Sequence, residues 1–424
     1  MPGHKGKGLL GCEKFDITEI DGADVLSVGE GIIGESERNL SALYGTAASF
    51  YSTEGSTACI KAMLHLVSTG APKNSVILAA RNAHKAFMHA CALLDLDVKW
   101  MSSNESFGIS ACLLDKAEVE KYLKAQESPV TAVYITSPDY LGNVADVNGI
   151  AEVCHRYGTK LLVDSAHGAY LNFLKENMHP IALGADMCCD SAHKTLPALT
   201  GAAYLHIAKS AEKYAENARE ALALFSSTSP SYLTLCSLDL CTKYLAEQFK
   251  SELDKTVRRV EELKSKLSSL GFILFGNEPL KITVKTADFG YTGDEVAHIL
   301  RDFGVECEFC DPDFVVLMPS AHNEAADFER VFQAFCSIKR KNAIEKSIPA
   351  VPSEIKLAMS IREAMFSAKK TVTIETALGK ICASPAVACP PAIPIAVCGQ
   401  VIERAQIELF EYYGIKTCTV VDAK

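Results

Sequence analysis

Long apolar runs are scarce in this sequence of 424 residues. No stretch approaches the roughly 18 apolar residues that a transmembrane helix needs, and the most apolar late stretch, residues 385–402, is interrupted by four prolines. The first residues, MPGHKGKG, lack the apolar core of a signal peptide. These absences predict a cytoplasmic protein that does not cross a membrane.

An excess of positive charge is also missing. Lys and Arg number 42 against 52 Asp and Glu, a net charge of −10, and no long block carries one sign. This balance argues against nucleic acid or an anionic membrane as the main partner. The hydrophobic content of 48% and charged content of 22% are typical of globular proteins, and the length predicts two or more domains.

Paired zinc ligands are absent as well. Sixteen cysteines are scattered through apolar segments, which favours reduced, buried thiols over disulfides when no export signal is present. The one C-x-x-C, from Cys307 to Cys310, has neither a second cysteine pair nor a nearby histidine pair. Because zinc sites need about four ligands, we predict no metal.

What the sequence does contain, between residues 41 and 235, is an alternation of short apolar runs with amphipathic segments. The runs predict strands at 75–79, 98–101, 130–136, 160–164, 187–190 and 201–206. The segments between them predict helices at 56–68, 84–94, 113–126 and 147–157. This α/β order predicts a mainly parallel sheet with helices on both faces.

A second, smaller α/β domain is predicted at residues 270–340. It contains strands at 280–284, 305–309 and 314–318, and helices at 292–303, capped by Thr292, and 324–339. One long amphipathic helix over 236–269 is expected to link the two domains. Residues 1–40 form an N-terminal arm, and residues 341–424 form a C-terminal segment.

Two residues at the ends of predicted strands indicate a site for pyridoxal phosphate (PLP). Lys194 lies in a loop, Asp190-Ser-Ala-His-Lys, and Asp164 ends the run 160–164. A lysine can form a Schiff base with the cofactor, and an aspartate can hold its ring nitrogen protonated. Taken singly, an exposed loop lysine or a turn aspartate is an equally ordinary interpretation.

A phosphate cradle is predicted where Gly55, Ser56 and Thr57 open a helix, because free N–H groups and hydroxyls there suit a dianion. A plain helix cap is the alternative. Ser191 and His193 could contact the same phosphate.

The two faces of the cofactor ring have candidate neighbours too. His84 follows a strand and could stack on one face, although it could equally be a neighbour of a helix cap. Ala166 could pack the opposite face, with His167 as a nearby polar group.

Together these segments resemble the bacterial-type ornithine/lysine/arginine decarboxylases, which are fold-type-I PLP enzymes. The matching segments are 1–8 (MPGHKGKG), 15–19 (FDITE), 50–57 (FYSTEGST), 81–85 (RNAHK), 164–169 (DSAHGA), 191–199 (SAHKTLPAL), 227–232 (STSPSY) and 389–394 (CPPAIP). The chain resembles the short form, without the N-terminal wing domain of the larger members. It departs from the family at Ser165, where relatives carry an acidic residue, and at Ala392, where they carry glycine.

The resemblance implies a PLP-dependent transferase fold of the aspartate-aminotransferase type. It implies that Lys194 binds PLP, that Asp164 pairs with the ring nitrogen, and that Ser227 reaches the phosphate of a neighbouring subunit, so that the protein is a homodimer with shared active sites. His84 and Ala166 would flank the ring. The remaining phosphate-side positions match as well: Gly55, Ser56, Thr57, Ser191 and His193.

The implied reaction is decarboxylation of lysine, ornithine or arginine to the amine and CO₂, with Lys194, His193 and Asp164 as catalytic residues. His193 or Lys194 would return the proton to the substrate carbon. Apart from the resemblance, Asp16 and Glu19 are candidate partners for the distal charge of a basic substrate because they lie near the N-terminal motif, although a solvated surface acid is the more ordinary interpretation of each. Three alternatives remain at this point: another fold-type-I PLP reaction of the aminotransferase, aldolase or desulfurase type, a non-catalytic PLP-binding homologue, or a coincidental motif in a generic α/β protein.

Overall fold

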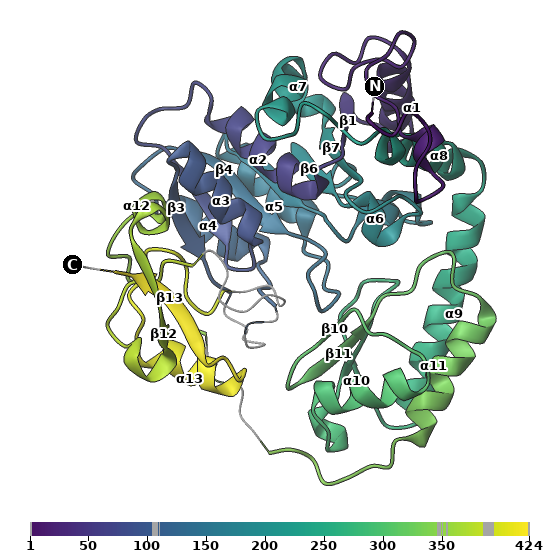
Figure 1. The fold of residues 1–424 in the computed structure, drawn as a ribbon. Coiled ribbons are helices and arrows are strands. Elements are labelled where there is room, and N and C mark those ends of the chain that lie inside the picture. The colour runs from purple at the N-terminus through teal and green to yellow at the C-terminus, as the bar shows by residue number, and fades with distance from the viewer. Residues whose placement is uncertain are drawn as a thin grey trace.

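A seven-stranded sheet forms the centre of the computed structural model, which describes residues 2–103, 109, 111–345, 349, 351–352, 355–384 and 394–422 (Figure 1). The order across the sheet is β1-β7-β6-β5-β4-β2-β3. The strands are β1 (Ala48–Ser52), β2 (Val76–Ala80), β3 (Asp97–Met101), β4 (Val130–Thr136), β5 (Lys160–Asp164), β6 (Met187–Asp190) and β7 (Ala203–Ile207). Neighbours from β6 to β3 pair in parallel, and β7 is antiparallel to both β6 and β1. The predicted α/β class and mainly parallel sheet are therefore confirmed.

Strands β4, β5 and β6 coincide with the predicted apolar runs, because each strand is buried on both faces and reads as a continuous apolar segment. Strand β1 escaped prediction. Its sequence, ASFYS, contains two serines, and Ser49 is buried because its hydroxyl meets His206 of β7 at 2.8 Å. A polar residue with a distant partner gives no signal in the local pattern.

Helices cover both faces of this sheet. One apolar cluster packs α2 (Gly55–Ser68), α3 (Lys85–Leu94) and α7 (Ala215–Ala223) on one face. A second packs α4 (Lys116–Lys124) and α5 (Val147–Arg156) on the other. A helix that the sequence analysis missed, α1 (Ile32–Tyr44), packs against α8 (Tyr232–Glu247).

The expectation of one continuous helix over 236–269 is wrong. The chain forms α8 and then α9 (Phe249–Ser269), separated at Gln248, whose φ of −131° and ψ of −34° lie outside helical geometry. The bend places the fully buried Phe249 ring against Phe173, at a centroid distance of 5.3 Å. Amphipathic spacing continues through the bend, so the sequence pattern did not reveal it.

The smaller sheet is antiparallel, in the order β10-β11-β9-β8, and Figure 1 shows α9, α10 and α11 beside it. Its elements are β8 (Ile273–Phe275), β9 (Ile282–Lys285), α10 (Gly293–Asp302), β10 (Phe309–Cys310), β11 (Phe314–Leu317) and α11 (Ala325–Ser337). Thr292 caps α10 as predicted. The predicted strand 305–309 is wrong except at its end, because the Val305 N–H closes the end of α10 by donating to the Leu300 carbonyl.

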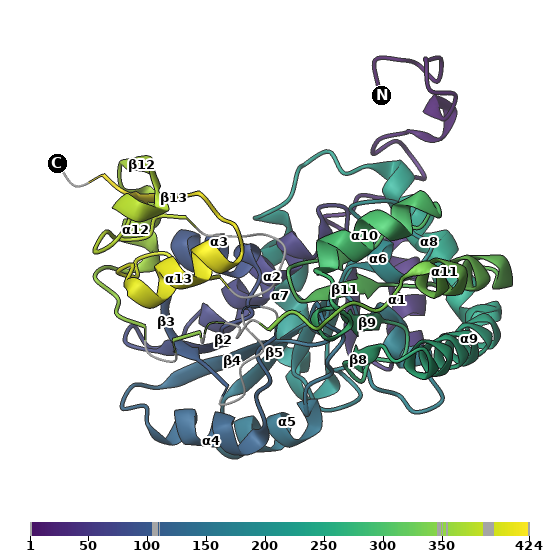
Figure 2. The same ribbon diagram turned by 90° about the horizontal axis from the view of Figure 1, so that it is seen from below.

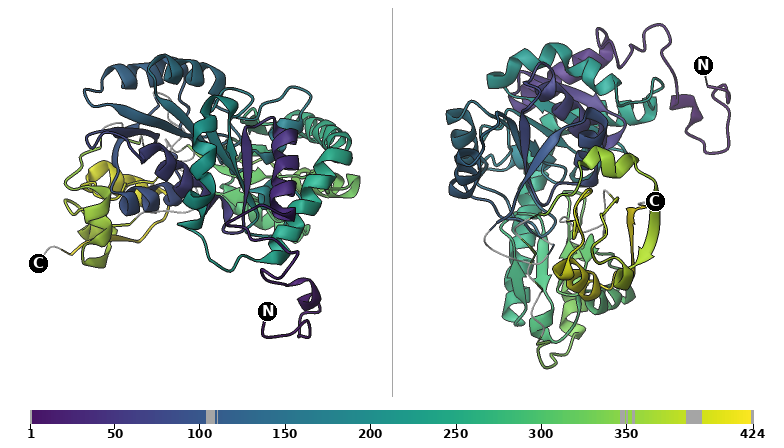
Figure 3. Two further views of the ribbon diagram at one scale, coloured as in Figure 1. Left: turned by 90° about the horizontal axis from the view of Figure 1, so that it is seen from above. Right: turned by 90° about the vertical axis from the view of Figure 1, so that its left-hand side faces the viewer.

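The C-terminal elements lie beside the β3 edge of the large sheet (Figures 1 and 2). They are α12 (Ile361–Phe366), β12 (Lys369–Thr373), α13 (Arg404–Tyr412) and β13 (Thr417–Val421), with β12 and β13 paired antiparallel. Arg362 joins them to the main body by donating to the carbonyl of Ala92 at 2.8 Å. At the other terminus, the first residues extend away from the rest of the protein (Figures 2 and 3), and Leu9 is fully exposed.

None of the helices in the described ranges has the length and apolar character needed to span a membrane. The cysteines in the same ranges are all free thiols, most of them buried.

Leu253 of α9 is fully buried in the cluster that joins α9 to the small sheet. Replacing it with alanine should lower the free energy of unfolding by about 3 kcal/mol, because a cavity remains in the core. The matched control, Lys255→Ala, alters an exposed residue two positions along the same helix and should change it by about 0.5 kcal/mol or less. Urea denaturation followed by circular dichroism measures both, and equal losses would show that this face of α9 carries no core.

Candidate active site

The predicted site residues follow strands whose carboxyl ends share one edge of the large sheet. Strands β2, β4, β5 and β6 run parallel, and β1 runs in the same direction because β7 is antiparallel to both β1 and β6. His84 follows β2, Asp164 ends β5, and Lys194 follows β6. Ligand sites of open α/β sheets lie at this edge.

Lys194 is held by a histidine from the neighbouring loop. It lies in the single helical turn α6 (Ala192–Thr195), and its Nζ is 2.9 Å from Nε2 of His167, which is only 4% exposed. The ring of Tyr140 lies beside both, 4.9 Å from the His167 ring and 5.9 Å from Nζ of Lys194. Tyr140 was not predicted, because it lies in a loop and is not part of the matched motifs.

The direction of this contact follows from charge. Burial holds the pKa of His167 well below its usual value, and the positive charges of Lys281 and Lys194 lower it further. A neutral imidazole has one nitrogen that accepts, so Nε2 accepts from the Lys194 amine and Nδ1 carries the proton.

Asp164 lies nearly buried at the end of β5, with 2% of its surface exposed. Its Oδ2 accepts from the Tyr134 hydroxyl at 3.1 Å and its Oδ1 from the Ala166 N–H at 3.2 Å, with the Cys189 thiol 3.7 Å from Oδ1. Tyr134 was also missed. The predicted strand 130–136 contained its signal, since Thr136 pairs with Asp164 and a residue two positions earlier points to the same face.

His84 is the N-cap of α3, where its Nδ1 accepts from the Ala86 N–H at 3.2 Å. Burial lowers the pKa of His84, opposed by the negative charge of Asp164. The capping bond uses one edge of the His84 ring. Because one imidazole can both cap a helix and stack on a cofactor ring, this bond is compatible with both predicted roles.

The two predicted halves of the phosphate cradle do meet. The Ser191 hydroxyl donates to that of Ser56 at 2.9 Å, although the residues are 135 positions apart. The Gly55 N–H donates to the Gly201 carbonyl at 2.8 Å, which joins the start of α2 to the loop that follows Lys194. At Gly201, with φ of +92°, a side chain would lie 2.9 Å from the Thr53 carbonyl, so this close approach requires glycine.

The other predicted contacts have mixed outcomes. The His193 ring is anchored to the backbone, since its Nδ1–H donates to the Ala202 carbonyl at 2.9 Å, and Nε2 is the ring nitrogen left for other contacts. Thr57 and Ala166 are half-buried next to Ser56 and His167 in the sequence. Ala392 lies outside the described residues.

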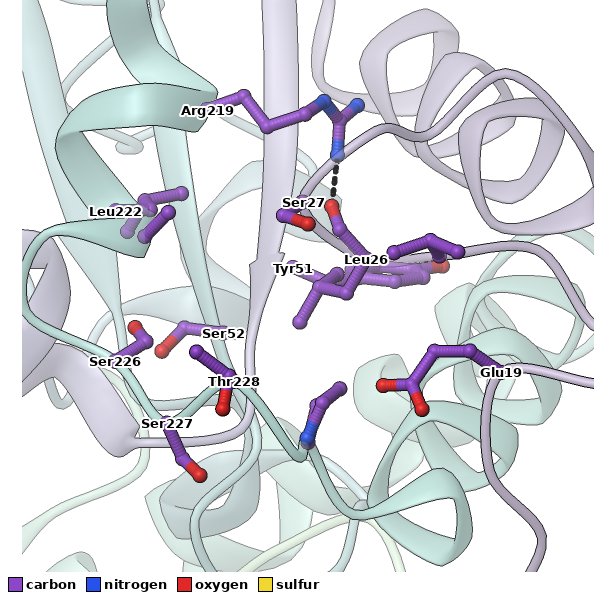
Figure 4. A pocket seen from close by; sticks show the side chains of 13 residues that line it. Glu19, Leu26, Ser27, Tyr51, Ser52, Arg219, Leu222, Ser226, Ser227 and Thr228 are labelled. Carbon is purple, nitrogen blue, oxygen red and sulfur yellow. Dashed lines mark hydrogen bonds between the residues drawn. The ribbon is translucent and has the colours of Figure 1, made fainter. Parts of the chain in front are cut away.

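Ser227 is not brought to Lys194 within one chain. It is exposed and lines a cavity of about 210 Å³ that Lys194 does not line (Figure 4). Its hydroxyl accepts from the Ser229 N–H. Ser52 and Glu19 line the same cavity, and Ser52 is the last residue of β1, before the short loop that leads to Gly55. Asp16, the other carboxylate considered for the substrate, lies 3.2 Å from His4.

These residues fit PLP. A Cβ at Gly55, where φ is +68°, would have no atom within 4 Å, so there is open space beside the two serine hydroxyls. Among the described residues, the buried Nδ1 of His167 and Oγ of Ser165 have no hydrogen-bond partner. A lysine amine, a buried carboxylate and a pair of hydroxyls at a helix start are the groups that this cofactor requires.

The sequence matches the family described as "Orn/Lys/Arg decarboxylase, major domain" over residues 11–331. The chain belongs to this family. Because members of this family are PLP-dependent, the protein is a PLP-dependent amino-acid decarboxylase. The alternative that its motifs are a coincidence in a generic α/β protein is therefore wrong.

The sequence similarity to individual relatives extends over nearly the full length of this chain. An arginine decarboxylase of Bacillus anthracis is 27% identical over 96% of this chain and 88% of the relative, and one of Bacillus cereus is 27% identical over 93% and 91%. The E. coli constitutive lysine decarboxylase has the same fold, with a TM-score of 0.80 at 17% identity over 100% of this chain and 79% of that one. A Sphingomonas wittichii serine palmitoyltransferase also shares this fold, with a TM-score of 0.59 at 15% identity over 72% of this chain and 75% of that one. These similarities confirm the predicted fold type.

A second buried polar group of this decarboxylase lies on β6 and β7. Oδ2 of Asp190 accepts from Nε2 of His179 at 3.0 Å and lies 3.2 Å from Nε2 of His206. Burial alone would raise the pKa of Asp190, but the two histidines outweigh it and hold the pKa below its usual range. One possible ligand atom from each of His179, Cys188 and Asp190 lies within 4.8 Å of the other two. The contact of 3.0 Å between His179 and Asp190 is a direct hydrogen bond.

The depressed pKa of His167 has a consequence for stability. Below pH of about 6.5 the unfolded chain binds a proton at this histidine that the folded chain does not, so stability falls as pH falls. His167→Gln removes this difference, and the loss of stability between pH 7 and pH 5.5 should shrink by about 1 kcal/mol. Urea unfolding of the cofactor-free protein at both pH values measures it. An unchanged loss would mean that His167 already carries its proton when folded.

Proposed function

We propose that the protein decarboxylates lysine, ornithine or arginine to the corresponding amine and CO₂, using PLP bound to Lys194. The observation that carries the proposal is the convergence of Lys194, Asp164 and the Ser56–Ser191 pair at one edge of the sheet. The three groups come from different loops, and together they offer the amine, the ring-nitrogen partner and the phosphate contacts of one cofactor.

Each residue then has a role that follows from its surroundings. Lys194 supplies the amine that forms the imine. His167 orients this amine by accepting a hydrogen bond from it. Asp164, whose Oδ2 accepts from the Tyr134 hydroxyl, would hold the ring nitrogen of the cofactor in its protonated form. When bound, PLP supplies a protonated ring that accepts the electron pair left on the α-carbon as CO₂ departs.

The phosphate and the ring faces would be held by groups already in position. Ser56, Thr57 and Ser191 would donate to the phosphate beside Gly55, with His193 close to it. His84 would stack on one ring face and Ala166 pack the other, with His167 adjacent.

The proton for the α-carbon would come from His193 or the freed Lys194 amine. Both lie in α6, and Nδ1 of His193 is already committed to the Ala202 carbonyl. Only Nε2 of this ring is left to carry a proton toward the substrate.

A basic substrate is supported by the relatives named arginine decarboxylase and by acidic residues near the shared site. If Ser227 reaches the phosphate of a neighbouring subunit, Glu19 is brought there with it, because both line one cavity. Asp16 is less suited, since its carboxylate is occupied by His4. We therefore propose a homodimer in which Glu19 binds the distal amine or guanidinium of the substrate in the active site of the neighbouring subunit.

We further propose that the chain is divided into an N-terminal arm (1–40), a PLP-binding domain (41–235), a link (236–269), a small domain (270–340) and a C-terminal segment (341–424). The bend at Gln248 lies within the link. The free cysteines of the described ranges support a cytoplasmic location, where thiols stay reduced.

Substituting Lys194 with alanine should abolish the imine absorbance of the PLP-loaded protein and lower CO₂ release by at least about a thousandfold, because the covalent step is lost. The control, Lys209→Ala, alters an exposed lysine beyond β7 and should retain both signals. Lysine, ornithine and arginine are assayed separately, with mass spectrometry of the products. Retention of the band and of CO₂ release by the Lys194 variant would refute the assignment, and a keto acid or aldehyde product would indicate a different PLP reaction.

Shared active sites predict rescue between two inactive variants. Lys194→Ala lacks the amine, and Ser227→Asp repels the phosphate of the neighbouring subunit, so each homodimer should be inactive. Co-expression should restore about a quarter of wild-type activity, because half of the dimers are mixed and each mixed dimer has one intact site. If Ser227 serves its own chain, mixed dimers contain no intact site and activity stays absent.

A further inference from the structure

Tyr140, which the sequence motifs did not single out, lies in a buried loop but is itself only half-buried. The loop follows β4, and the residues on either side, Asp139 and Leu141, are buried. The Tyr140 ring lies 4.9 Å from the His167 ring and 5.9 Å from Nζ of Lys194, which is also only partly buried. A large aromatic side chain therefore borders the reactive amine.

Hydrogen bonds from segment 277–283, next to and within β9, hold the loop on both sides of Tyr140. Nζ of Lys281 donates to the carbonyl of the preceding residue at 2.6 Å, and the Thr283 hydroxyl donates to the carbonyl of the following residue at 2.7 Å. The Gly142 carbonyl accepts from two N–H groups of the same segment at 2.9 and 2.8 Å. The backbone that positions the Tyr140 ring is thus fixed by the smaller sheet.

The ring itself packs on the apolar cluster of that sheet. Phe309 of β10, which is 4% exposed, lies edge-to-face with the Tyr140 ring at a centroid distance of 6.0 Å. Phe314 and Val316 belong to the same cluster. A side chain that is held through both its backbone and its ring keeps one orientation, which is what a binding surface requires.

The distance between the Tyr140 ring and Nζ of Lys194 fits an amino acid bound in between. An amine that replaces the Lys194 nitrogen during the reaction has its α-carbon about 1.5 Å from its own nitrogen, and the next atom about 2.5 Å away. Carbon atoms in contact lie about 3.5–4.0 Å apart. A chain that runs toward a ring centred 5.9 Å from the nitrogen therefore meets the ring at its second or third atom.

The chemistry of the ring decides which part of the substrate makes this contact. The face of an aromatic ring is electronegative, so it repels a carboxylate and packs favourably against CH₂ groups. Lysine, ornithine and arginine all have CH₂ groups as the second and third atoms of the chain. Phe309 behind Tyr140 makes the surroundings more apolar still.

We propose that Tyr140 is a specificity-determining residue whose ring packs against the first CH₂ groups of a basic amino-acid substrate. Thr283 is a positioning residue that holds the loop for it. This assignment rests on the proposed function and deepens it, since it names the part of the substrate that is recognised beside Lys194.

Binding of amines to the PLP-loaded protein tests the proposal without turnover. The probes are putrescine, cadaverine and agmatine, which keep the chain but have no carboxylate, and methylamine, which has no chain; calorimetry measures their affinities. Tyr140→Ala should weaken binding of the product amine that wild type binds best about tenfold, because burial of about two CH₂ groups is lost. Tyr140→Phe keeps the ring and should bind as wild type. Methylamine should bind equally to all variants.

A second pair of variants tests the support of the ring. Thr283→Val removes the hydroxyl that holds the loop and should weaken the same binding about threefold, with no further effect in the Tyr140→Ala background, because it acts through the ring. Thr286→Val is the matched control and should bind as wild type. Thr286 is also fully buried, and its hydroxyl donates to a backbone carbonyl at 3.2 Å, that of Asp313, outside the loop after β4.

Far-UV circular dichroism establishes that each variant is folded. If Tyr140→Ala is not, the comparison of Thr283→Val with Thr286→Val decides, and equal binding by these two overturns the proposal. Unchanged binding by a folded Tyr140→Ala also overturns it. An equal loss for methylamine, or a tenfold loss of PLP affinity in the cofactor-free protein, does so as well, because the ring would then contact the nitrogen or the cofactor.

Failure of the proposed function gives a different result. A wild-type protein that binds PLP, binds none of the three product amines and releases no CO₂ from lysine, ornithine or arginine refutes the proposed function, and the role of Tyr140 falls with it. Wild-type binding that is not altered in the folded Tyr140→Ala variant overturns the role of Tyr140 alone.

Discussion

The hydrogen bond between Lys194 and His167 is the contact on which the rest of the site depends. It requires an uncharged imidazole directly beside an amine, and burial of His167 provides this condition. The two residues come from loops after adjacent parallel strands, β6 and β5, so their distance is set by the spacing of the sheet. A shift of either strand would separate the pair.

Desolvation explains why the surrounding polar groups are arranged as they are. Asp164 is nearly buried and is matched by a tyrosine hydroxyl and a backbone N–H. Asp190 is fully buried and lies between two histidines. A buried group without a partner is costly, so such pairings fix the loops that contain them. The same edge of the sheet thus holds rigid backbone and reactive side chains together.

The small domain contributes to the site by fixing the loop that follows β4. The Lys281 ammonium donates to the Asp139 carbonyl at 2.6 Å and the Thr283 hydroxyl to the Leu141 carbonyl at 2.7 Å, on the two sides of Tyr140. These bonds hold Tyr140 beside His167 and Lys194. The sequence pattern could not reveal this contact, because Asp139 and Lys281 are 142 positions apart in the chain.

The sequence by itself determined the strands β4 to β6, the order of the α/β elements, the family, and the candidate residues Lys194, Asp164 and Ser56, because local apolar runs and ordered motifs contain this information. Only the tertiary structure decided that Ser191 meets Ser56, that His167 accepts from Lys194, and that Tyr134 aligns Asp164. It also decided the bend at Gln248, strand β1 and the burial of Lys281. The physical reason is that each of these depends on a partner distant in the chain, and the free energy of burying and pairing polar groups is defined only once the chain has folded.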